Sequence, residues 1–390
     1  MLGMERNHTA WSETQWAGGA APAARRVPHS LLGADFLGWL RLLFDARFSV
    51  SWCCWPTAAS ITAASLGNTL LRCVQAAVYA GRVTRTELAP PPVFVLGHWR
   101  SGTTFLHELL CLDPRHTYPT TYACFNPNHF LLTERLFTRL FPIPSDRRRP
   151  MDGMPAGWQR PQEDEFAIRN LGRPSPYVRS VFPGLPHLYR EYLDLAHIPQ
   201  RALRRWKRTF LTFLKQVTFR RPGRLVLKSP PHTFRIPVLL ELFPDARFVY
   251  IVRNPLDVVP SAVKTVGRFD RSQRLHTKDW PPLWDYFIGL QARMHERVEQ
   301  TRQQVAANRF HEARFEDLIA EPEAQLRRIY EVLQLGPFEP AQPAVRKYVA
   351  ATQRHEHAVH EPPAAAREEI RRRLAGFMAR HGYAEATATG

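Results

Sequence analysis

The chain has 390 residues, 44% of them hydrophobic, and a formal net charge of +18 at pH 7. This length suits one large α/β domain with additions or two domains, and the charge suits a polyanionic partner such as a nucleotide, a nucleic acid, a glycan or an anionic membrane. The sequence contains neither the aromatic-glycine signature of RNA-recognition modules nor the Cys/His spacing of zinc fingers, which excludes those two classes.

The five cysteines show no C-x-x-C spacing and do not indicate a disulfide framework. They favour a reduced, cytoplasmic setting.

The N-terminal quarter is predicted to be a flexible arm (1–30) followed by a helical extension (31–90). The arm lacks the apolar segment of a signal peptide. Apolar residues then recur at helical spacing, at Phe36, Leu37, Leu40, Leu43 and Phe44.

The longest run without a charged residue is Phe48–Leu71. It is long enough to span a bilayer, but Pro56 and many Ser and Thr residues dilute its hydrophobicity. A buried helical pair, or a segment lying on a membrane, is therefore favoured over a transmembrane helix. Peripheral membrane contact through residues 31–85 stays open.

The central feature of the sequence is an apolar run, Val93–Leu96, followed by a glycine-bounded loop, Gly97–Gly102, and a helical pattern from Thr103. A strand, tight loop and helix in this order form an anion cradle, because free backbone N–H groups and the helix dipole converge where the helix begins. Thr103 and Thr104 add hydroxyl groups, and Arg100 adds a permanent positive charge.

The loop is almost a P-loop, whose pattern is G-x-x-x-x-G-K-[ST]. The glycines have the correct spacing, but Thr103 occupies the lysine position. The P-loop lysine reaches the terminal phosphates, and the next hydroxyl holds Mg²⁺. The missing lysine suits an anionic group that needs no metal, and it disfavours a kinase or NTPase. A purely structural glycine turn is the plain alternative.

Two further buried strands are predicted at Leu225–Lys228 and Arg247–Arg253, and a fourth at Phe310–Phe315. Strands alternating with helices predict an α/β fold with three layers around a mainly parallel sheet. Ligands of such sheets bind beyond the carboxyl ends of the strands. The polar residues Arg100, Lys228 and Arg253 stand at these ends.

The remaining segments complete the predicted organisation. Helices are expected at 130–142, 202–219, 284–304, 316–333 and 370–381. Loops are expected at 112–122, at the proline- and aromatic-rich segment 174–192, which is a candidate wall of an acceptor groove, and at 340–365. The predicted catalytic domain covers 91–340, and residues 341–390 form a C-terminal loop and helix that pack on it.

The loop Gly97-His98-Trp99-Arg100-Ser101-Gly102-Thr103-Thr104 resembles the 5′-phosphosulfate-binding loop of sulfotransferases that use 3′-phosphoadenosine 5′-phosphosulfate (PAPS). Arg253 and Ser261, eight residues apart after a strand, resemble the 3′-phosphate-binding element of that family. Phe315-Glu316-Asp317-Leu318 is similar to its aromatic-Glu-Asp-Leu strand end. The resemblance covers Pro91 to Leu335, and it implies a P-loop NTPase-like topology. The sequence looks closer to bacterial and glycan-modifying members than to cytosolic small-molecule ones.

The resemblance implies transfer of a sulfuryl group from PAPS to a hydroxyl or amine, giving adenosine 3′,5′-bisphosphate without a metal. Arg100, Thr103 and Thr104 would hold the 5′-phosphosulfate, within a donor site formed by residues 97–104. Lys228 would neutralise the leaving group. Arg253 would offer a guanidinium fork to the 3′-phosphate, and Ser261 a hydroxyl.

The general base departs from the cytosolic pattern. Those members carry a catalytic histidine two residues after the strand-end lysine, where this sequence has Pro230. Glycan-modifying members use a glutamate, which favours Glu163 first, then Glu165, His232 and His98. The plain alternative is that acidic residues at 163–165 stabilise the first turn of a helix.

Two other functions stay open at this stage: a diverged P-loop kinase or NTPase, and a non-catalytic polyanion-binding protein. The acceptor is undefined, with a glycan among the candidates. No nucleic-acid partner is expected, and the sequence does not indicate an oligomeric state.

Overall fold

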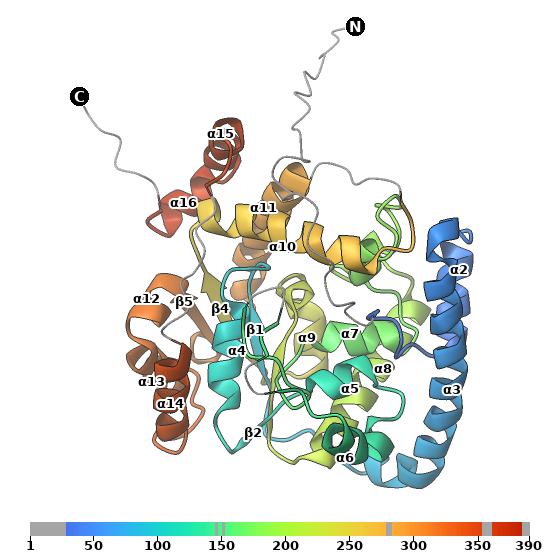
Figure 1. Cartoon of the computed structure of the whole chain (residues 1–390). Coiled ribbons are helices and arrows are strands. Elements are labelled where there is room, and N and C mark those ends of the chain that lie inside the picture. The colour runs from blue at the N-terminus through green and yellow to red at the C-terminus, as the bar shows by residue number, and fades with distance from the viewer. Residues whose placement is uncertain (1–28, 145–146, 150–152, 278–282, 353–360, 384–390) are drawn as a thin grey trace, which may run out of the picture.

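A computed structural model describes residues 29–144, 147–149, 153–277, 283–352 and 361–383 of the chain. Its centre is a five-stranded parallel sheet with the strand order β2-β3-β1-β4-β5. The strands are β1 (Val93–Leu96), β2 (His116–Thr117), β3 (Arg224–Lys228), β4 (Arg247–Val252) and β5 (Phe310–Arg314). The predicted α/β class and mainly parallel sheet are confirmed, and β1 lies in the middle (Figure 1).

Side chains alternate between two cores on opposite faces of the sheet. On β1, Phe94 and Leu96 join the larger core, whereas Val93 and Val95 join the smaller one. All four are fully buried, as expected for a central strand covered on both faces. The molecule therefore has the three predicted layers.

The helices divide between these two cores. The smaller core is covered by α4 (Thr103–Cys111), α12 (Phe315–Ala320), α13 (Pro322–Val332) and α14 (Gln342–Thr352). The larger core is built from α2 (Phe36–Asp45), α3 (Trp55–Thr84), α5 (Thr121–Phe125), α6 (Phe130–Leu140), α7 (Asp164–Asn170), α8 (Gln200–Arg220), α9 (Ile236–Leu242), α10 (Pro255–Gln273), α11 (Leu283–Arg302), α15 (Ala364–Arg373) and α16 (Ala375–Arg380). Short 3₁₀ turns are η1 (Trp52–Cys54), η2 (Pro176–Ser180), η3 (Arg190–Tyr192), η4 (Pro230–Phe234) and η5 (Ala307–Arg309).

The N-terminal extension is helical as expected. α2 and α3 lie along one outer edge of the molecule (Figure 1). Within the described residues, no helix is both long enough and apolar enough to cross a membrane. The predicted flexible arm lies almost wholly outside the described residues.

Three local predictions were wrong. Residues 342–352 form α14 rather than a loop, because Val345 and Tyr348 bury one face of this helix in the smaller core. The last predicted helix is two helices, α15 and α16, which meet at Leu374. The predicted loop 112–122 contains β2, whose two residues are too short a run to show strand periodicity.

Candidate active site

The loop between β1 and α4 has the backbone of an anion cradle. Gly97, Arg100 and Gly102 have positive φ angles of 147°, 73° and 96°. Gly102 precedes α4, and no side chain of the described residues caps that end of the helix with a hydrogen bond. The first N–H groups of α4 are thus directed to the edge of the sheet, where β1, β3 and β4 end.

Gly102 is also required by a close approach. A Cβ atom at this position would lie 2.2 Å from the Phe315 ring. The same ring also contacts Arg253, whose guanidinium carbon lies 4.3 Å from the ring centroid. Phe315 therefore packs the Gly97–Gly102 loop against the end of β4, which gives a physical role to the aromatic residue of the strand-end motif.

Replacing Gly102 with alanine is expected to lower the free energy of unfolding by about 1–3 kcal/mol, because alanine is strained at this φ and its Cβ displaces Phe315. Gly67→Ala is the matched control. It lies inside α3, and a Cβ there meets nothing within 4 Å. We expect the control to stabilise the protein by up to about 1 kcal/mol. Urea unfolding measures both, and a Gly102→Ala variant as stable as its parent would contradict the packing described here.

Arg100, Arg253 and Ser261 meet beside the loop. Arg100 Nε donates a hydrogen bond to Ser261 Oγ at 3.0 Å, and Arg253 Nη1 donates to the Arg100 carbonyl at 3.4 Å. The Arg100 side chain thus lies toward the Arg253–Ser261 element. Arg100 and Arg253, which are 153 residues apart along the chain, therefore form one cationic group.

Lys228 ends β3 on the other side of the loop and is 3% exposed. Its Nζ donates to Glu163 Oε1 at 2.6 Å and to Thr104 Oγ1 at 3.3 Å. The Tyr177 hydroxyl, from η2, donates to Glu163 Oε2. Burial and the neighbouring Glu163 carboxylate raise the pKa of Tyr177 well above its usual value, so the phenol stays protonated and keeps donating.

The three adjacent carboxylates at the start of α7 point to three different partners. Asp164 accepts from His232 Nε2 at 2.8 Å and from Ser229 Oγ at 3.1 Å. Glu165 forms a buried ion pair with Arg235 at 2.5 Å. The side chains of both pairs are 0% exposed, whereas the Glu163 side chain is 15% exposed. Only Glu163 of the three is within reach of a ligand.

Comparison with known proteins identifies the family. A family model described as "Sulfotransferase family" matches residues 91–340. Omega-hydroxy-beta-dihydromenaquinone-9 sulfotransferase Stf3 of Mycobacterium bovis is 44% identical over 319 residues, which cover 82% of each protein. The chain belongs to the sulfotransferase family.

Solved sulfotransferase structures share its fold. STF9 from Mycobacterium avium superposes with a TM-score of 0.65, at 20% identity, over 88% of this chain and 86% of that one. STF1 from Mycobacterium tuberculosis gives a TM-score of 0.55, at 19% identity, over 87% and 92%. This family membership accounts for the sequence resemblance and leaves no support for the kinase reading.

Two histidines considered as bases in this sulfotransferase are packed inside the protein. The His232 ring is 0% exposed, and it lies between Phe94 and Phe210. His98 is 2% exposed, and its Nδ1 is bonded to the Trp99 carbonyl oxygen at 2.7 Å. Burial lowers the pKa of His98 to about 4, which keeps it neutral at pH 7.

Of the other loop residues, some stabilise the turn and others lie beside Lys228 or Tyr177. Ser101 is buried, and its hydroxyl donates to the His98 carbonyl at 2.8 Å, which closes the turn. Thr103 is buried under the loop, and Thr104 is half-buried beside Lys228. Trp99 packs near the Tyr177 ring, with 6.2 Å between centroids. The loop therefore contacts the residue that holds Glu163.

Sequence reasoning missed Tyr177 and Thr233. Tyr177 lies in the proline-rich segment identified only as a candidate groove wall. Thr233 Oγ1 accepts the Gly97 N–H at 2.9 Å and so fixes the start of the loop from η4. No local pattern marks either residue. Among the residues that the structure describes, no group of three or more His, Cys, Asp or Glu side chains is placed to hold a metal ion.

Proposed function

We propose that this sulfotransferase binds PAPS across the donor loop and transfers its sulfuryl group to an acceptor hydroxyl, with Glu163 as the general base. The observation that carries the proposal is the contact of Glu163 with Lys228 at 2.6 Å, beside Thr104 of the donor loop. An acid–base group and a cation for the leaving group thus stand together at the carboxyl edge of the sheet.

The donor would lie along this edge. The amides of Gly102–Thr104 and the Thr104 hydroxyl face the 5′-phosphosulfate, and Arg253 with Ser261 faces the 3′-phosphate. Arg100 lies between these two parts of the site and contacts both the 5′-phosphosulfate and the 3′-phosphate. The sites for the two ends of the nucleotide are supported by the Arg100–Ser261 contact and by the packing of Phe315 on Gly102 and Arg253.

The reaction follows from these positions. The acceptor oxygen attacks sulfur in line, so that a new O–S bond forms as the bond from sulfur to the bridging phosphate oxygen breaks. Lys228 moves from Glu163 toward this leaving oxygen and stabilises its charge. Glu163 Oε1 is then free to accept the acceptor proton, while Tyr177 still holds Oε2. Adenosine 3′,5′-bisphosphate leaves.

The acceptor is proposed to be a hydroxyl at the end of a long apolar chain, as on a dihydromenaquinone. The relative at 44% identity is named for an omega-hydroxy-beta-dihydromenaquinone, and it aligns over 82% of this chain. That name favours a lipid-borne hydroxyl over the glycan or amine acceptors left open by the sequence. Peripheral membrane contact through residues 31–85 is proposed with it, because such an acceptor resides in lipid.

The direct test is transfer of ³⁵S-sulfate from PAPS to an omega-hydroxylated dihydromenaquinone in detergent, compared with a desulfated glycan and a simple phenol. We expect labelled product from the dihydromenaquinone alone, with one adenosine 3′,5′-bisphosphate released per sulfate transferred. Transfer only to the glycan would overturn the acceptor assignment. Absence of transfer to every class would overturn the function.

Stabilisation of the protein by nucleotides tests the proposed binding of PAPS separately from the transfer reaction. We expect adenosine 3′,5′-bisphosphate at 100 times its Kd to stabilise the protein by about 2.7 kcal/mol, and ATP with Mg²⁺ to have little effect. Thermal unfolding with each ligand measures this difference. A larger shift with ATP and Mg²⁺ would support the kinase alternative instead.

A further inference from the structure

The long helix α3 has an inverted arrangement of polar and apolar side chains. Three of its five buried residues are polar, namely Ser65, Asn68 and Gln75. The Trp39 indole N–H donates to Thr62 Oγ1 at 2.8 Å, and Asn68 Nδ2 donates to the Ala34 carbonyl at 2.9 Å. Gln75 Oε1 accepts the Leu131 N–H at 2.8 Å. Ile61 and Val83 are also buried, but four aliphatic side chains point outward: Leu66, Leu70, Val74 and Val78 are 43–68% exposed.

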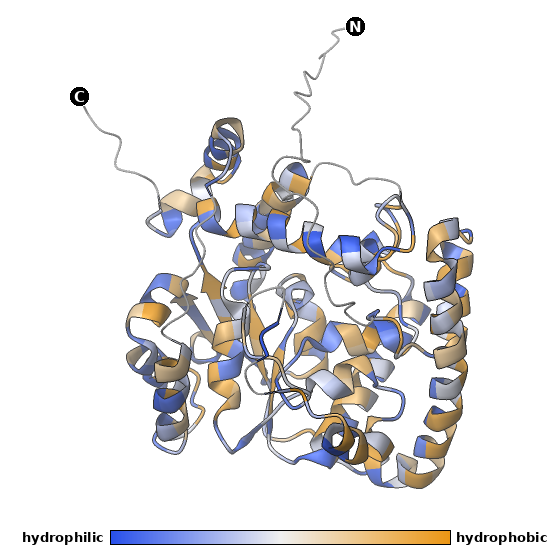
Figure 2. Ribbon diagram, in the orientation of Figure 1, coloured by the Kyte–Doolittle hydropathy of each residue, from blue (hydrophilic) through white to orange (hydrophobic). Residues whose placement is uncertain are grey.

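The same surface continues over α2 and η1. Leu37, Phe44 and Phe48 are each more than 60% exposed, and Trp52 and Trp55 are 85% and 66% exposed. The structure describes fourteen exposed large hydrophobic side chains, and ten of them lie between residues 37 and 78. This corrects the apolar face that the sequence predicted for α2. Trp39 and Leu42 face the core, whereas Leu37, Leu40 and Phe44 of the predicted face are exposed. We call this surface of α2, η1 and α3 the apolar edge (Figures 1 and 2).

The apolar edge is too extensive to be scattered surface residues, and such patches mark contact with a protein or a membrane. No Asp, Glu, Lys or Arg occurs between Phe48 and Leu71. Exposed tryptophans beside aliphatic side chains are typical of the water–lipid boundary, where an indole places its ring among acyl chains and its N–H among headgroups.

Arginines border the apolar edge. Arg41, Arg72 and Arg205 lie close enough to Arg173 that their charges add to burial in lowering its pKa. Arg72 is 3.1 Å from Asp35, but half of its side chain stays exposed. A second copy of this chain would bring an identical cationic rim against this one, whereas anionic headgroups complement it.

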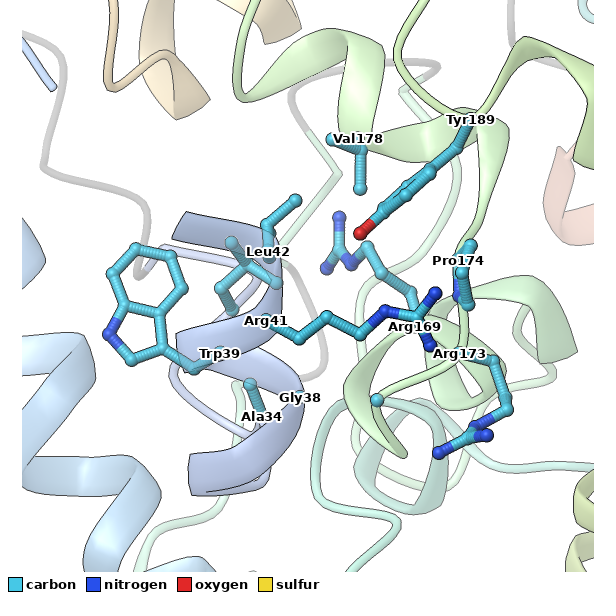
Figure 3. Close-up of a pocket in the computed structure, with 12 residues that line it drawn as sticks. Ala34, Gly38, Trp39, Arg41, Leu42, Arg169, Arg173, Pro174, Val178 and Tyr189 are labelled. Carbon is cyan, nitrogen blue, oxygen red and sulfur yellow. The ribbon is translucent and has the colours of Figure 1, made fainter. Parts of the chain in front are cut away.

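A pocket beside α2 adds buried positive charge to this rim. Arg41, Arg169 and Arg173 line it together with Leu42 and Tyr189, between α2 and the segment that follows α7 (Figure 3). Arg169 is 3% exposed and donates from Nη2 to the Ser30 carbonyl at 2.8 Å. Its Nη1 has no hydrogen-bond partner among the described residues. An unpartnered buried guanidinium nitrogen favours an anion at this pocket.

We propose that the apolar edge seats this protein on an anionic phospholipid bilayer. The outward side chains of α2, η1 and α3 enter the boundary between headgroups and acyl chains, α3 lies in the membrane plane, and the bordering arginines contact lipid phosphates. The inference deepens the proposed function and rests on it for its purpose. The pocket lies against Val178 of η2, next to Tyr177, so the edge brings lipid close to the residues that hold Glu163.

The test is co-sedimentation of the full chain with vesicles of phosphatidylcholine alone and with an equal mixture of phosphatidylcholine and phosphatidylglycerol. We expect binding to the mixed vesicles, weakened by salt. Leu70→Glu should weaken it at least about tenfold, through lost apolar burial and added repulsion. Ile319→Glu, which places the same charge on the exposed side of α12, is the matched control and should bind like the parent.

Brominated lipids give a second readout. They should quench tryptophan fluorescence in the parent, and much less in Trp52→Phe/Trp55→Phe. Equal binding by Leu70→Glu and its parent, or no binding to anionic vesicles, would overturn the proposal. So would a dimer in analytical ultracentrifugation that Leu70→Glu dissociates, because a second copy would then cover the edge.

These assays contain neither PAPS nor acceptor, so they separate this inference from the proposed function. Vesicle binding without any sulfate transfer would overturn the proposed function but support the membrane-binding surface. Sulfation of a detergent-solubilised omega-hydroxylated dihydromenaquinone by a protein that does not bind vesicles would overturn the membrane inference and support the proposed function.

Discussion

Replacing Glu163 with glutamine is expected to reduce turnover by about 10²–10⁴-fold, which is the usual contribution of a general base. Glutamine keeps the shape of the side chain and can still contact Lys228 and Tyr177, but it cannot take a proton at pH 7. Affinity for adenosine 3′,5′-bisphosphate should be unchanged or higher, because Lys228 loses a competing negative charge at 2.6 Å.

Single-turnover transfer from ³⁵S-labelled PAPS, together with calorimetric titration of adenosine 3′,5′-bisphosphate, measures both quantities. Glu165→Gln is the informative comparison. It breaks the buried pair with Arg235, and it should lower stability by about 3–5 kcal/mol rather than act on turnover alone. Full activity in Glu163→Gln would show that another group takes the proton.

Removing either arginine of the proposed donor site is expected to weaken donor binding by about 10–100-fold, the range for one lost charge-assisted contact. Arg253→Ala deletes the guanidinium that stacks on Phe315, and Arg100→Ala deletes the bond to Ser261. Arg346→Ala is the matched control, because Arg346 is exposed and pairs with Glu323 in a surface contact.

Nucleotides with and without a 3′-phosphate distinguish the role of Arg253 from that of Arg100. Arg253→Ala should weaken binding of adenosine 3′,5′-bisphosphate but hardly affect adenosine 5′-phosphosulfate, which lacks the 3′-phosphate. Arg100→Ala should weaken both. Equal losses for the two nucleotides in Arg253→Ala would place the 3′-phosphate elsewhere.

The sheet and the conformation of the Gly97–Gly102 loop could be predicted from sequence because their signals are local. Val93–Leu96, the two glycines and the helical pattern after Thr103 lie in one short stretch, and short apolar runs mark β3 and β4. The same reasoning fails for α14 and β2, where tertiary packing and a partner strand determine the structure of weakly patterned residues.

The roles of the three adjacent carboxylates at the start of α7 could not be distinguished from the sequence. Glu163, Asp164 and Glu165 are adjacent, and only their partners distinguish them: Lys228, His232 and Arg235 are 65 to 70 residues away along the chain. The apolar edge could not be predicted from sequence for a related reason. Helical periodicity shows that α3 has two faces, but it does not show that the polar one faces the protein.

The most direct test of the account is a crystal structure of this protein with adenosine 3′,5′-bisphosphate. We predict the 5′-phosphate on the amides of Gly102–Thr104 within reach of Lys228 Nζ, and the 3′-phosphate between the Arg253 guanidinium and the Ser261 hydroxyl. A nucleotide bound away from the ends of β1, β3 and β4, or with its two phosphates exchanged, would contradict it.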